Sequence, residues 1–460
     1  MPVSDLDETR EVEVHLDLNG RPRRVGLLRR HSSRQPADTL TFEYDRDWLD
    51  SEASFELDQG LPLTPGLFEA TRRRRLTGAL SDAAPDTWGR QLMRRAEQRR
   101  ARNEGRRVRS LHELDYLLGV TDEVRTGALR FRPSGGTGFR AHTATGVPTV
   151  VALRRLQGSV DRLEEGDESD EDLELILAPG SSLGGARPKA AIIDQEGRLA
   201  IAKFPRPTDD YSLETWEAIA LQLAERAGIA TPHHELVRFG DRPILLSRRF
   251  DREGTDRIPF LSAMSLTGSV DGESGSYPEI VDEITRQGAR AKADSMALYR
   301  RVAFNVLISN VDDHLRNHGF LWLDRAGWSL SPVYDLNPTP VDVRARVLTT
   351  RIDLDDATCS LELVLSACEY FGLSLSGARS IVRSVGEAVQ QWRTLAEETG
   401  ASPRETDRMA SAFEHDDLRR AVSLRRPFAP PARARGRRAA KEAPDANGRP
   451  LRTGRRTASD

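Results

Sequence analysis

The sequence predicts an α+β fold in two lobes, a β-rich amino-terminal lobe and an α-helical carboxy-terminal lobe. Short runs typical of strands lie within Glu11–Phe131 and again at Arg198–Phe204. From Ala357 to Leu424 the apolar residues recur at helical spacing instead. A chain of 460 residues is also long enough to bury more than one hydrophobic core.

The first part of the chain is mixed rather than purely β. Apolar spacing predicts helices around Asp86–Arg100 and Leu111–Leu118. The stretch Arg132–Gly146 is rich in Gly and Thr and is either a linker or a long loop. We therefore expect a first subdomain to end near residue 131.

The segment Pro179–Lys189, PGSSLGGARPK, has the composition of a loop that binds phosphate. Small residues leave the backbone amides free to face an anion, and basic residues add positive charge. Glycine pairs flanked by serines are also common in flexible turns, so a loop without a ligand is the alternative. The small residues are Ser181, Ser182, Gly184 and Gly185, and the basic ones are Arg187 and Lys189.

A strand with one interior cation comes next. Lys203 lies within the apolar run Arg198–Phe204, where a lysine is costly to bury unless it meets an anion. The following helix is predicted over Ser212–Ala227, with Gly228 as its terminator. Glu217 lies beside the apolar stripe of this helix, and we expect it to pair with Lys203. The alternative is an exposed lysine and a solvated glutamate.

The segment from Ser295 to Asp335 is the most informative part of the chain. Its helical apolar spacing predicts a buried helix over Ser295–Ile308, followed by a polar loop with the sequence DDHLRN at Asp312–Asn317. His318–Leu323 and Trp328–Tyr334 then read as two strands around a turn. Such a hairpin returns Asp335 to the end of the polar loop. The apolar positions of the helix are Met296, Val302, Ala303, Val306 and Leu307.

Asp-x-x-x-x-Asn followed by a second Asp is the order of parts in a protein-kinase phosphotransfer site. In such a site the first Asp, here Asp312, holds the substrate hydroxyl. The Asn and the later Asp, here Asn317 and Asp335, hold Mg²⁺ on the ATP phosphates, and Lys203 meets the same phosphates. Asp and Asn are also frequent capping and turn residues, which is the structural alternative.

Taken together, these segments resemble the HipA-type serine/threonine kinases, the toxin components of bacterial toxin–antitoxin pairs. The resemblance runs from about Glu11 to about Leu424 and consists of nine blocks in the family order. The blocks are VHLDLNGRPRRVGLL, FEYDRDWL, DAAPDTWGR, SSLGGARPK, LAIAKF, ETWEAIALQLAERAGI, RRFDR, DDHLRN and PVYDLNP.

This resemblance implies a protein-kinase-like fold that binds ATP and Mg²⁺ between its lobes. By position, Asp312 matches the catalytic base, Asn317 and Asp335 match the Mg²⁺ ligands, and Lys203 matches the lysine on the ATP phosphates. The residues themselves already place Glu217, Gly184 and Gly185 at the expected nucleotide site.

The resemblance also implies a regulatory phosphate loop. Ser182 matches the serine that autophosphorylates and switches the kinase off, although the adjacent Ser181 leaves the acceptor open. Lys189 closes this loop, and Phe250 falls where the adenine is held. A phosphoserine brings about two negative charges into a pocket that must accept ATP phosphates, which explains the inhibition physically.

The expected organisation has four parts. These are a HipA-like subdomain over 1–131, the nucleotide-binding part of a kinase core over 132–290, an α-helical catalytic lobe over 291–424 and a basic tail over 425–460. The tail has eleven Lys or Arg against three Asp or Glu and too few apolar residues to fold, so we expect disorder. It either aids solubility or strengthens contact with DNA or RNA in a salt-dependent way.

By resemblance, the substrate is a protein serine or threonine, plausibly on a translation component such as an aminoacyl-tRNA synthetase. The expected partner is a small helix-turn-helix antitoxin (HipB-like) that binds operator DNA together with the kinase. One alternative is a DNA-bound corepressor, suggested by the basic tail and the arginine runs Arg72–Arg75 and Arg99–Arg109. A second is a small-molecule phosphotransferase, because such enzymes share the Asp-x-x-x-x-Asn arrangement.

Composition sets broader limits. With 38% hydrophobic and 30% charged residues, no long apolar run and no signal-peptide core, we expect a soluble cytoplasmic protein without membrane contact. A net charge of −3 argues against a globally basic nucleic-acid binder. Cys359 and Cys368 lie in an apparently helical segment and should pack as small hydrophobes. The acidic segment Asp161–Glu174 is a solvated helix face or loop, or contacts the basic run Arg72–Arg75.

Overall fold

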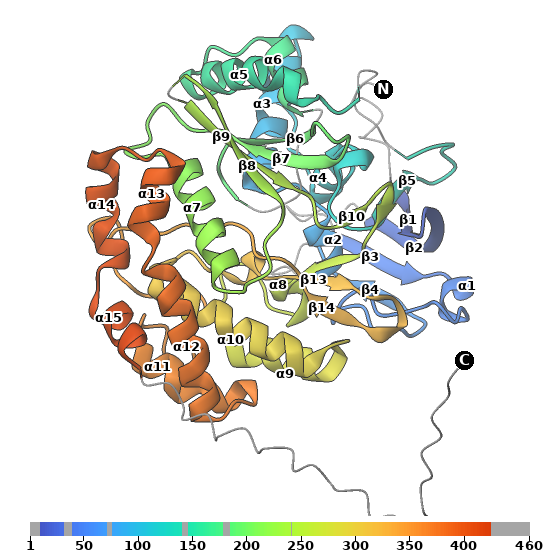
Figure 1. Cartoon of the computed structure of the whole chain (residues 1–460). Coiled ribbons are helices and arrows are strands. Elements are labelled where there is room, and N and C mark those ends of the chain that lie inside the picture. The colour runs from blue at the N-terminus through green and yellow to red at the C-terminus, as the bar shows by residue number, and fades with distance from the viewer. Residues whose placement is uncertain are drawn as a thin grey trace, which may run out of the picture. The chain divides into compact units, whose positions relative to one another are not determined.

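The computed structural model describes residues 10–31, 39–70, 76–139, 146–177, 185–240 and 242–424. The described residues form a β-rich amino-terminal region and a helical carboxy-terminal region, so the predicted fold class is confirmed (Figure 1). Several predictions fall outside these residues: Ser181, Ser182 and Gly184 of the phosphate loop, the run Arg72–Arg75 and the tail over 425–460.

An antiparallel five-stranded sheet organises the amino-terminal region, in the order β4-β3-β2-β1-β5. The turn between its first two strands is Asn19-Gly20, and both residues have positive φ, as two-residue hairpin turns of this kind require. The strands are β1 Glu11–Leu18, β2 Arg21–His31, β3 Thr39–Tyr44, β4 Leu67–Glu69 and β5 Leu129–Pro133, and the helices are α1 Arg46–Leu49, α2 Gly78–Asp82, α3 Thr87–Asn103 and α4 Glu113–Gly119.

A second antiparallel sheet, in the order β6-β7-β9-β8, lies between two layers of helix (Figure 1). Alternation along β7 directs Ala200 and Ala202 into a core formed with α5 and α6. Lys203, of opposite alternation, faces α7. The elements are α5 Leu153–Glu165, α6 Asp170–Leu177, β6 Lys189–Ile193, β7 Leu199–Lys203, α7 Leu213–Arg226, β8 His234–Phe239 and β9 Arg242–Arg248.

The helix predicted after β7 is confirmed as α7, and so are the residues predicted to begin and end it. The Ser212 hydroxyl accepts a hydrogen bond from the Thr215 amide and so caps the first turn of α7. The chain leaves the helix through Gly228, which has a φ of 72° and so lies in the left-handed region. Both signals are local, which is why the sequence shows them.

The hairpin that precedes Asp335 is also present, within the sheet β12-β13-β14. Its second strand ends at Leu330 rather than at the predicted Tyr334, because Pro332 has no amide hydrogen to donate to a neighbouring strand. The strands are β12 Phe260–Ser262, β13 Gly319–Trp322 and β14 Trp328–Leu330, and the short pair beside them is β10 Arg252–Glu253 and β11 Asp256–Arg257.

The carboxy-terminal helices pack around α10, Ala291–Leu307, which begins earlier than the predicted Ser295. The prediction for Met296 was wrong: this side chain is 44% exposed, because it lies on the outer face of α10. None of the described helices is long and apolar enough to cross a membrane. The others are α8 Ala263–Leu266, α9 Tyr277–Gln287, α11 Leu361–Ser366, α12 Leu375–Val389, α13 Trp392–Thr399, α14 Pro403–Phe413 and α15 Asp416–Ser423.

Five 3₁₀ helices complete the regular structure of the described residues. Cys359 precedes α11 and Cys368 lies in one of these 3₁₀ turns, so the helical placement of both was only approximate. Both thiols are buried and free, as expected. The 3₁₀ helices are η2 Asp122–Val124, η3 Val150–Ala152, η4 Leu315–Asn317, η5 Asp324–Ala326 and η6 Ala367–Phe371.

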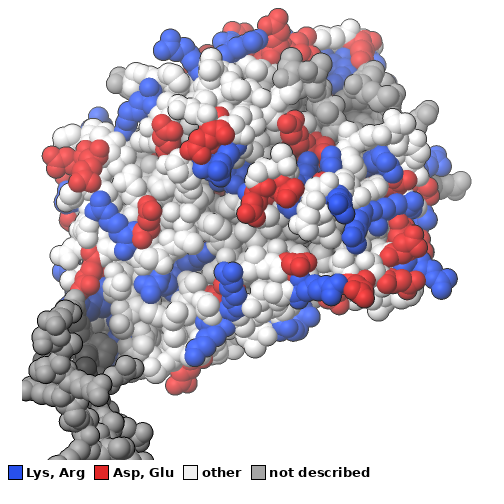
Figure 2. Space-filling view, turned by 45° about the vertical axis from the view of Figure 1, so that its right-hand side comes forward, with Lys and Arg blue, Asp and Glu red and all other residues white. Residues whose placement is uncertain are grey.

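The acidic segment Asp161–Glu174 is largely exposed on α5 and α6, as expected, and it also contacts α3. Arg99 of α3 binds the Asp170 carboxylate, and Arg162 binds Asp172 within the segment itself. Part of the charge of the Arg99–Arg109 run is therefore balanced inside the chain. On the face shown in Figure 2, basic and acidic side chains are interspersed.

A buried charge cluster connects the amino-terminal region to the central part of the chain. The Asp251 carboxylate is 1% exposed and accepts hydrogen bonds from Arg249 at 2.6 Å, Arg252 at 2.8 Å and the Gly127 amide at 2.7 Å. Burial acts to raise the pKa of Asp251, but the two guanidinium groups outweigh it and hold this pKa well below its ordinary value. The carboxylate therefore stays ionised at neutral pH.

We predict that Asp251→Asn lowers the free energy of unfolding by about 3 kcal/mol at pH 7, because it leaves buried guanidinium groups without their counter-charge. A depressed pKa stabilises the folded state above the unfolded value, so the difference from wild type should persist at pH 5 and shrink only below about pH 4. Urea unfolding at both pH values measures it. Asp282→Asn, an exposed position on α9, is the matched control and should change stability by less than about 0.5 kcal/mol.

Candidate active site

A cavity of about 1130 Å³ lies where α7, the second sheet, residues 76–90 and the loop after α10 meet. Its lining includes most of the residues that the sequence singled out, although they come from widely separated segments. These are Gly185, Lys189, Lys203, Glu217, Asp312 and Asp335. A cavity of this size is large enough for a nucleotide.

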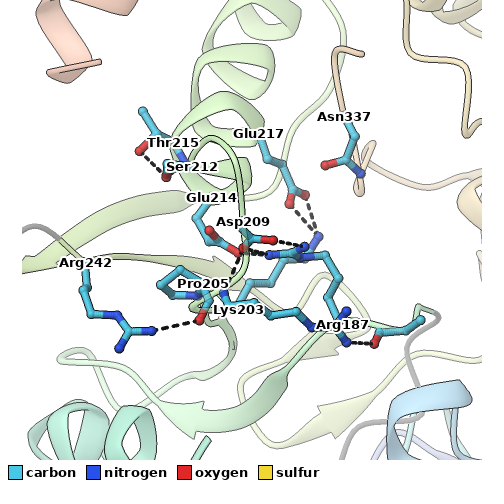
Figure 3. Close-up of polar contacts among 12 residues, drawn as sticks. Arg187, Lys203, Pro205, Asp209, Ser212, Glu214, Thr215, Glu217, Arg242 and Asn337 are labelled. Carbon is cyan, nitrogen blue, oxygen red and sulfur yellow. Dashed lines mark hydrogen bonds and ion pairs between the residues drawn. The ribbon is translucent and has the colours of Figure 1, made fainter. Parts of the chain in front are cut away.

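Lys203 joins two carboxylates at the centre of this cavity. Its Nζ lies 2.7 Å from both carboxylate oxygens of Glu217 and 2.8 Å from Oδ1 of Asp335. Figure 3 shows Lys203 reaching from β7 to Glu217 on α7. The Glu217 carboxylate also accepts the Asp335 amide at 3.1 Å. One strand, one helix and the loop after the hairpin are thus bound together by a single ammonium group.

The protonation states of this group follow from burial and charge. Burial alone lowers the pKa of Lys203, but Asp335 and Glu217 outweigh it and hold this pKa above its ordinary value. Burial acts to raise the pKa of Asp335. The positive charges of Lys203 and, to a smaller extent, Lys189 outweigh burial and hold this pKa far below its ordinary value. Lys203 is therefore a cation and Asp335 an anion at neutral pH.

The backbone at Asp335 is strained. Its φ is 59°, in the left-handed region that residues other than glycine adopt rarely, although Asp and Asn tolerate it best. The amide of Asp335 donates to Glu217 and its carboxylate binds Lys203, so both ends of the residue are held in this conformation. Strain that the surroundings enforce in this way is typical of functional sites.

Two neighbouring aspartates have opposite environments. The Asp312 side chain is 53% exposed and lines the cavity, with Arg344 Nη1 3.3 Å from its Oδ1. Asp313 is 1% exposed and accepts hydrogen bonds from the Tyr277 hydroxyl at 2.5 Å and the Thr349 amide at 2.8 Å. Asp312 is therefore the one that can meet a substrate, while Asp313 holds the loop in place.

Asn317 braces the same loop. Its side-chain Nδ2 donates to the backbone carbonyl of Asp312 at 2.8 Å, which leaves its Oδ1 as an acceptor. Asn317 is buried and is not in the cavity lining, whereas Asp335 is. A carboxylate and an amide oxygen are ligands that Mg²⁺ accepts, so the residue types fit this metal. Among the described residues no group of three His, Cys, Asp or Glu side chains is arranged to hold a metal.

The end of the predicted phosphate loop is anchored from several sides. Lys189 Nζ binds the Asp86 carboxylate at 2.8 Å, and the Gly185 carbonyl accepts the Trp88 amide at 3.2 Å. Arg187 forms two hydrogen bonds with Asp209, one of them 2.9 Å long, as Figure 3 shows. Residues 185–189 are therefore held against α3, through Asp86 and Trp88, and against the segment before α7.

Lys189 and Lys203 face each other directly across β6 and β7. Like charges opposite each other destabilise a sheet unless each has a counter-charge. Here Asp86 neutralises Lys189, and Glu217 with Asp335 neutralises Lys203. Two ammonium groups and three carboxylates therefore lie close together at this end of the cavity.

Phe250 does not line the cavity. Its ring packs beside Tyr334 and Phe260, with centroid distances of 5.6 and 6.3 Å, and it is these two residues that face the cavity. A contact between Phe250 and an adenine stays a prediction. The geometry instead gives Phe250 a role in supporting the aromatic wall.

Sequence reasoning missed Asp86 and Arg344 as site residues. Asp86 precedes α3 and caps it, since its Oδ1 accepts the Gly89 amide at 2.7 Å. That cap is visible in the sequence, but its second bond reaches Lys189, which is 103 positions away. Arg344 follows Asp335 in a segment without a helical or strand pattern, so nothing local marks it.

Comparisons with known proteins agree with this geometry. The sequence model described as "HipA N-terminal domain" matches residues 16–132, and the one described as "HipA-like C-terminal domain" matches residues 181–413. A Sinorhizobium fredii protein named "Putative kinase Y4mE" is 25% identical over 329 residues, which cover 65% of this chain and 72% of that protein. A Haemophilus influenzae protein named "Putative kinase" is 24% identical over 182 residues, 34% of this chain and 52% of that one.

Among solved structures, the chain resembles HipA from Shewanella oneidensis MR-1, solved in a complex with HipB and operator DNA. The TM-score is 0.64 with 18% sequence identity, over 89% of this chain and 96% of that one. At this identity the likeness concerns the fold.

The buried Asp313 gives the site a pH-dependent stability. Burial raises the pKa of Asp313 to about 7, although Tyr277 and two backbone amides oppose the rise. Between about pH 4 and pH 7 the folded chain then holds a proton that the unfolded chain lacks. The stability from this group is complete below its unfolded pKa and is lost as the pH rises through 7.

We predict that Asp313→Asn abolishes this dependence, because an amide does not titrate. Relative to wild type, the free energy of unfolding of the variant should rise by about 2 kcal/mol between pH 5 and pH 8. Chemical unfolding at pH 5, 6, 7 and 8 measures the change. Asp312→Asn is the matched control at an exposed neighbour, and a parallel pH dependence of wild type and Asp313→Asn contradicts the prediction.

Proposed function

We propose that this chain, which belongs to the HipA family, is a kinase that transfers the terminal phosphoryl group of ATP to a protein serine or threonine. The observation that carries the proposal is the placement of Lys203 between Glu217 and Asp335, in a cavity that Asp312 also lines. These are the parts that phosphoryl transfer needs, since its catalysis rests on positioning and charge neutralisation. The kinase names of two relatives support the same activity.

Each residue has a role that its surroundings support. Asp312 is exposed to the cavity and can accept a hydrogen bond from the acceptor hydroxyl. Lys203 is cationic and lies beside Asp335, so it can offset phosphate charge. Asn317 and Asp335 offer oxygen ligands for Mg²⁺. When bound, ATP and Mg²⁺ supply the phosphoryl group and the neutralising charge.

The proposal includes autophosphorylation of Ser182, with Ser181 as the alternative acceptor. Its support is family membership and the position of Gly185 and Lys189, which directly follow this segment and line the cavity. Phosphate on such a serine adds about two negative charges next to the ATP phosphates and opposes their binding.

The biological setting that fits the family is a toxin–antitoxin pair in the cytoplasm. The proposed partner is a small helix-turn-helix antitoxin of the HipB type, which brings operator DNA to the complex. The Shewanella oneidensis HipA that this chain resembles was solved with HipB and operator DNA, which supports the proposal. The proposed target is a translation component such as an aminoacyl-tRNA synthetase.

We predict that the purified chain with Mg²⁺ and γ-labelled ATP incorporates label at Ser182, mapped by mass spectrometry. Asp312→Asn should lower the rate of labelling at least about 100-fold, because it removes the group that positions the hydroxyl. Ser182→Ala should abolish the label, whereas Ser181→Ala, the matched control, should retain it.

Other outcomes favour other functions. Label at Ser181 alone reassigns the acceptor. A phosphorylated metabolite without any phosphoprotein favours the small-molecule phosphotransferase. No label and no ATP binding, together with operator binding that survives Asp312→Asn, favours the corepressor and contradicts the kinase.

A further inference from the structure

Six cations line the cavity among the described residues, and five of them are held by carboxylates other than Asp312. The cations are Arg90, Arg187, Lys189, Lys203, Arg316 and Arg344. The carboxylate partners of the first five, in the same order, are Glu113, Asp209 with Glu214, Asp86, Glu217 with Asp335, and Asp271 with Asp82.

Arg344 differs because its carboxylate partner is Asp312 itself. Arg344 Nη1 lies 3.3 Å from Asp312 Oδ1, and the two side chains are 49% and 53% exposed. An exposed ion pair of this kind contributes only about 0–1 kcal/mol, so it opens readily. The guanidinium is therefore the cation of the cavity that can most easily leave its carboxylate for a phosphate.

The backbone on both sides of Arg344 is held by hydrogen bonds, while the side chain itself is half exposed. On one side the Thr339 amide donates to the Ser309 carbonyl at 3.1 Å. On the other, Arg346 donates to the Val306 carbonyl at 3.0 Å, and the Thr349 amide donates to Asp313. Arg344 thus starts from a constant position beside Asp312.

The loop that carries Asp312 supplies no cation of its own for this task. Its one arginine is Arg316, which binds Asp271 at 2.8 Å and lies 3.5 Å from Asp82. Lys203 and Lys189 lie on the neighbouring strands β7 and β6, and each has a buried counter-charge. A positive group next to Asp312 therefore has to come from another segment of the chain. Arg344 is such a group, because it lies beside Asp312.

We propose that Arg344 is a catalytic residue that stabilises the charge on the phosphoryl group while it moves to the acceptor. This inference rests on the kinase activity proposed above. The acceptor oxygen forms a bond to the γ-phosphorus, the bond to the bridging oxygen breaks and ADP leaves, and the hydroxyl proton passes to Asp312. As the hydroxyl binds Asp312, Arg344 is released and its planar guanidinium donates hydrogen bonds to the phosphoryl oxygens.

The first test compares Arg344→Gln and Arg344→Lys with wild type in single-turnover labelling of the full chain by ATP. We expect Arg344→Gln to slow the transfer about 100-fold, as loss of one transition-state donor does elsewhere. Arg344→Lys should retain an intermediate rate, because lysine keeps the positive charge but cannot donate two parallel hydrogen bonds as a guanidinium does. Arg325→Gln is the control: this arginine pairs with Glu52 on the surface outside the cavity.

Two readouts separate a catalytic role from a structural one. Binding of a non-hydrolysable ATP analogue should match wild type in Arg344→Gln, whereas binding of ADP with aluminium fluoride, which imitates the transferring phosphoryl group, should weaken about 100-fold. Added guanidinium should partly restore transfer in Arg344→Ala but not in Asp312→Asn.

Equal transfer rates in wild type and Arg344→Gln overturn the proposal. So does an equal loss of affinity for both nucleotide complexes, which assigns Arg344 to ground-state binding. A wild-type chain that transfers no phosphate overturns the kinase activity as well, so the two failures are distinguishable.

Discussion

The structure depends on one partly buried ammonium group shared by two carboxylates. Lys203 on β7 binds Glu217 on α7 and Asp335 in the loop after β14, so the sheet, the helix and the carboxy-terminal region meet at one atom. Removing Lys203 leaves two neighbouring carboxylates without their counter-charge, which is strongly destabilising. The same cluster holds Asp335 in its left-handed conformation and keeps its carboxylate ionised. The contacts that stabilise the fold thus also hold the carboxylate that we propose as a metal ligand.

The amino-terminal subdomain is part of the site and not an appendage to it. Asp86 caps α3 with one oxygen and binds Lys189 with the other, while the Trp88 amide holds the Gly185 carbonyl. Through these contacts the position of α3 determines where the end of the phosphate loop lies. Asp86 therefore links the first turn of α3 to the proposed nucleotide site.

The pair Asp312 and Asp313 shows where sequence reasoning reaches its limit. The two residues are identical in type and adjacent, so spacing to Asn317 and Asp335 had to decide between them, and it selected the one that the cavity exposes. The role of Asp313 was not predictable, because its partners Tyr277 and Thr349 lie 36 residues away on either side. The predictions that Met296 is buried and that the second hairpin strand reaches Tyr334 were wrong for a similar reason. Both depend on which parts of the chain pack against the element.

The sequence by itself determined the fold class, the cap and terminator of α7, the hairpin before Asp335 and the pairing of Lys203 with Glu217. These follow from spacing within one or two elements, where propensity and periodicity act directly. Only the tertiary structure decided that Asp86 meets Lys189, that Phe250 stands behind the cavity wall and that Arg344 lies beside Asp312. Such contacts join residues far apart in the chain, and the packing of the whole core, not any local pattern, brings them together.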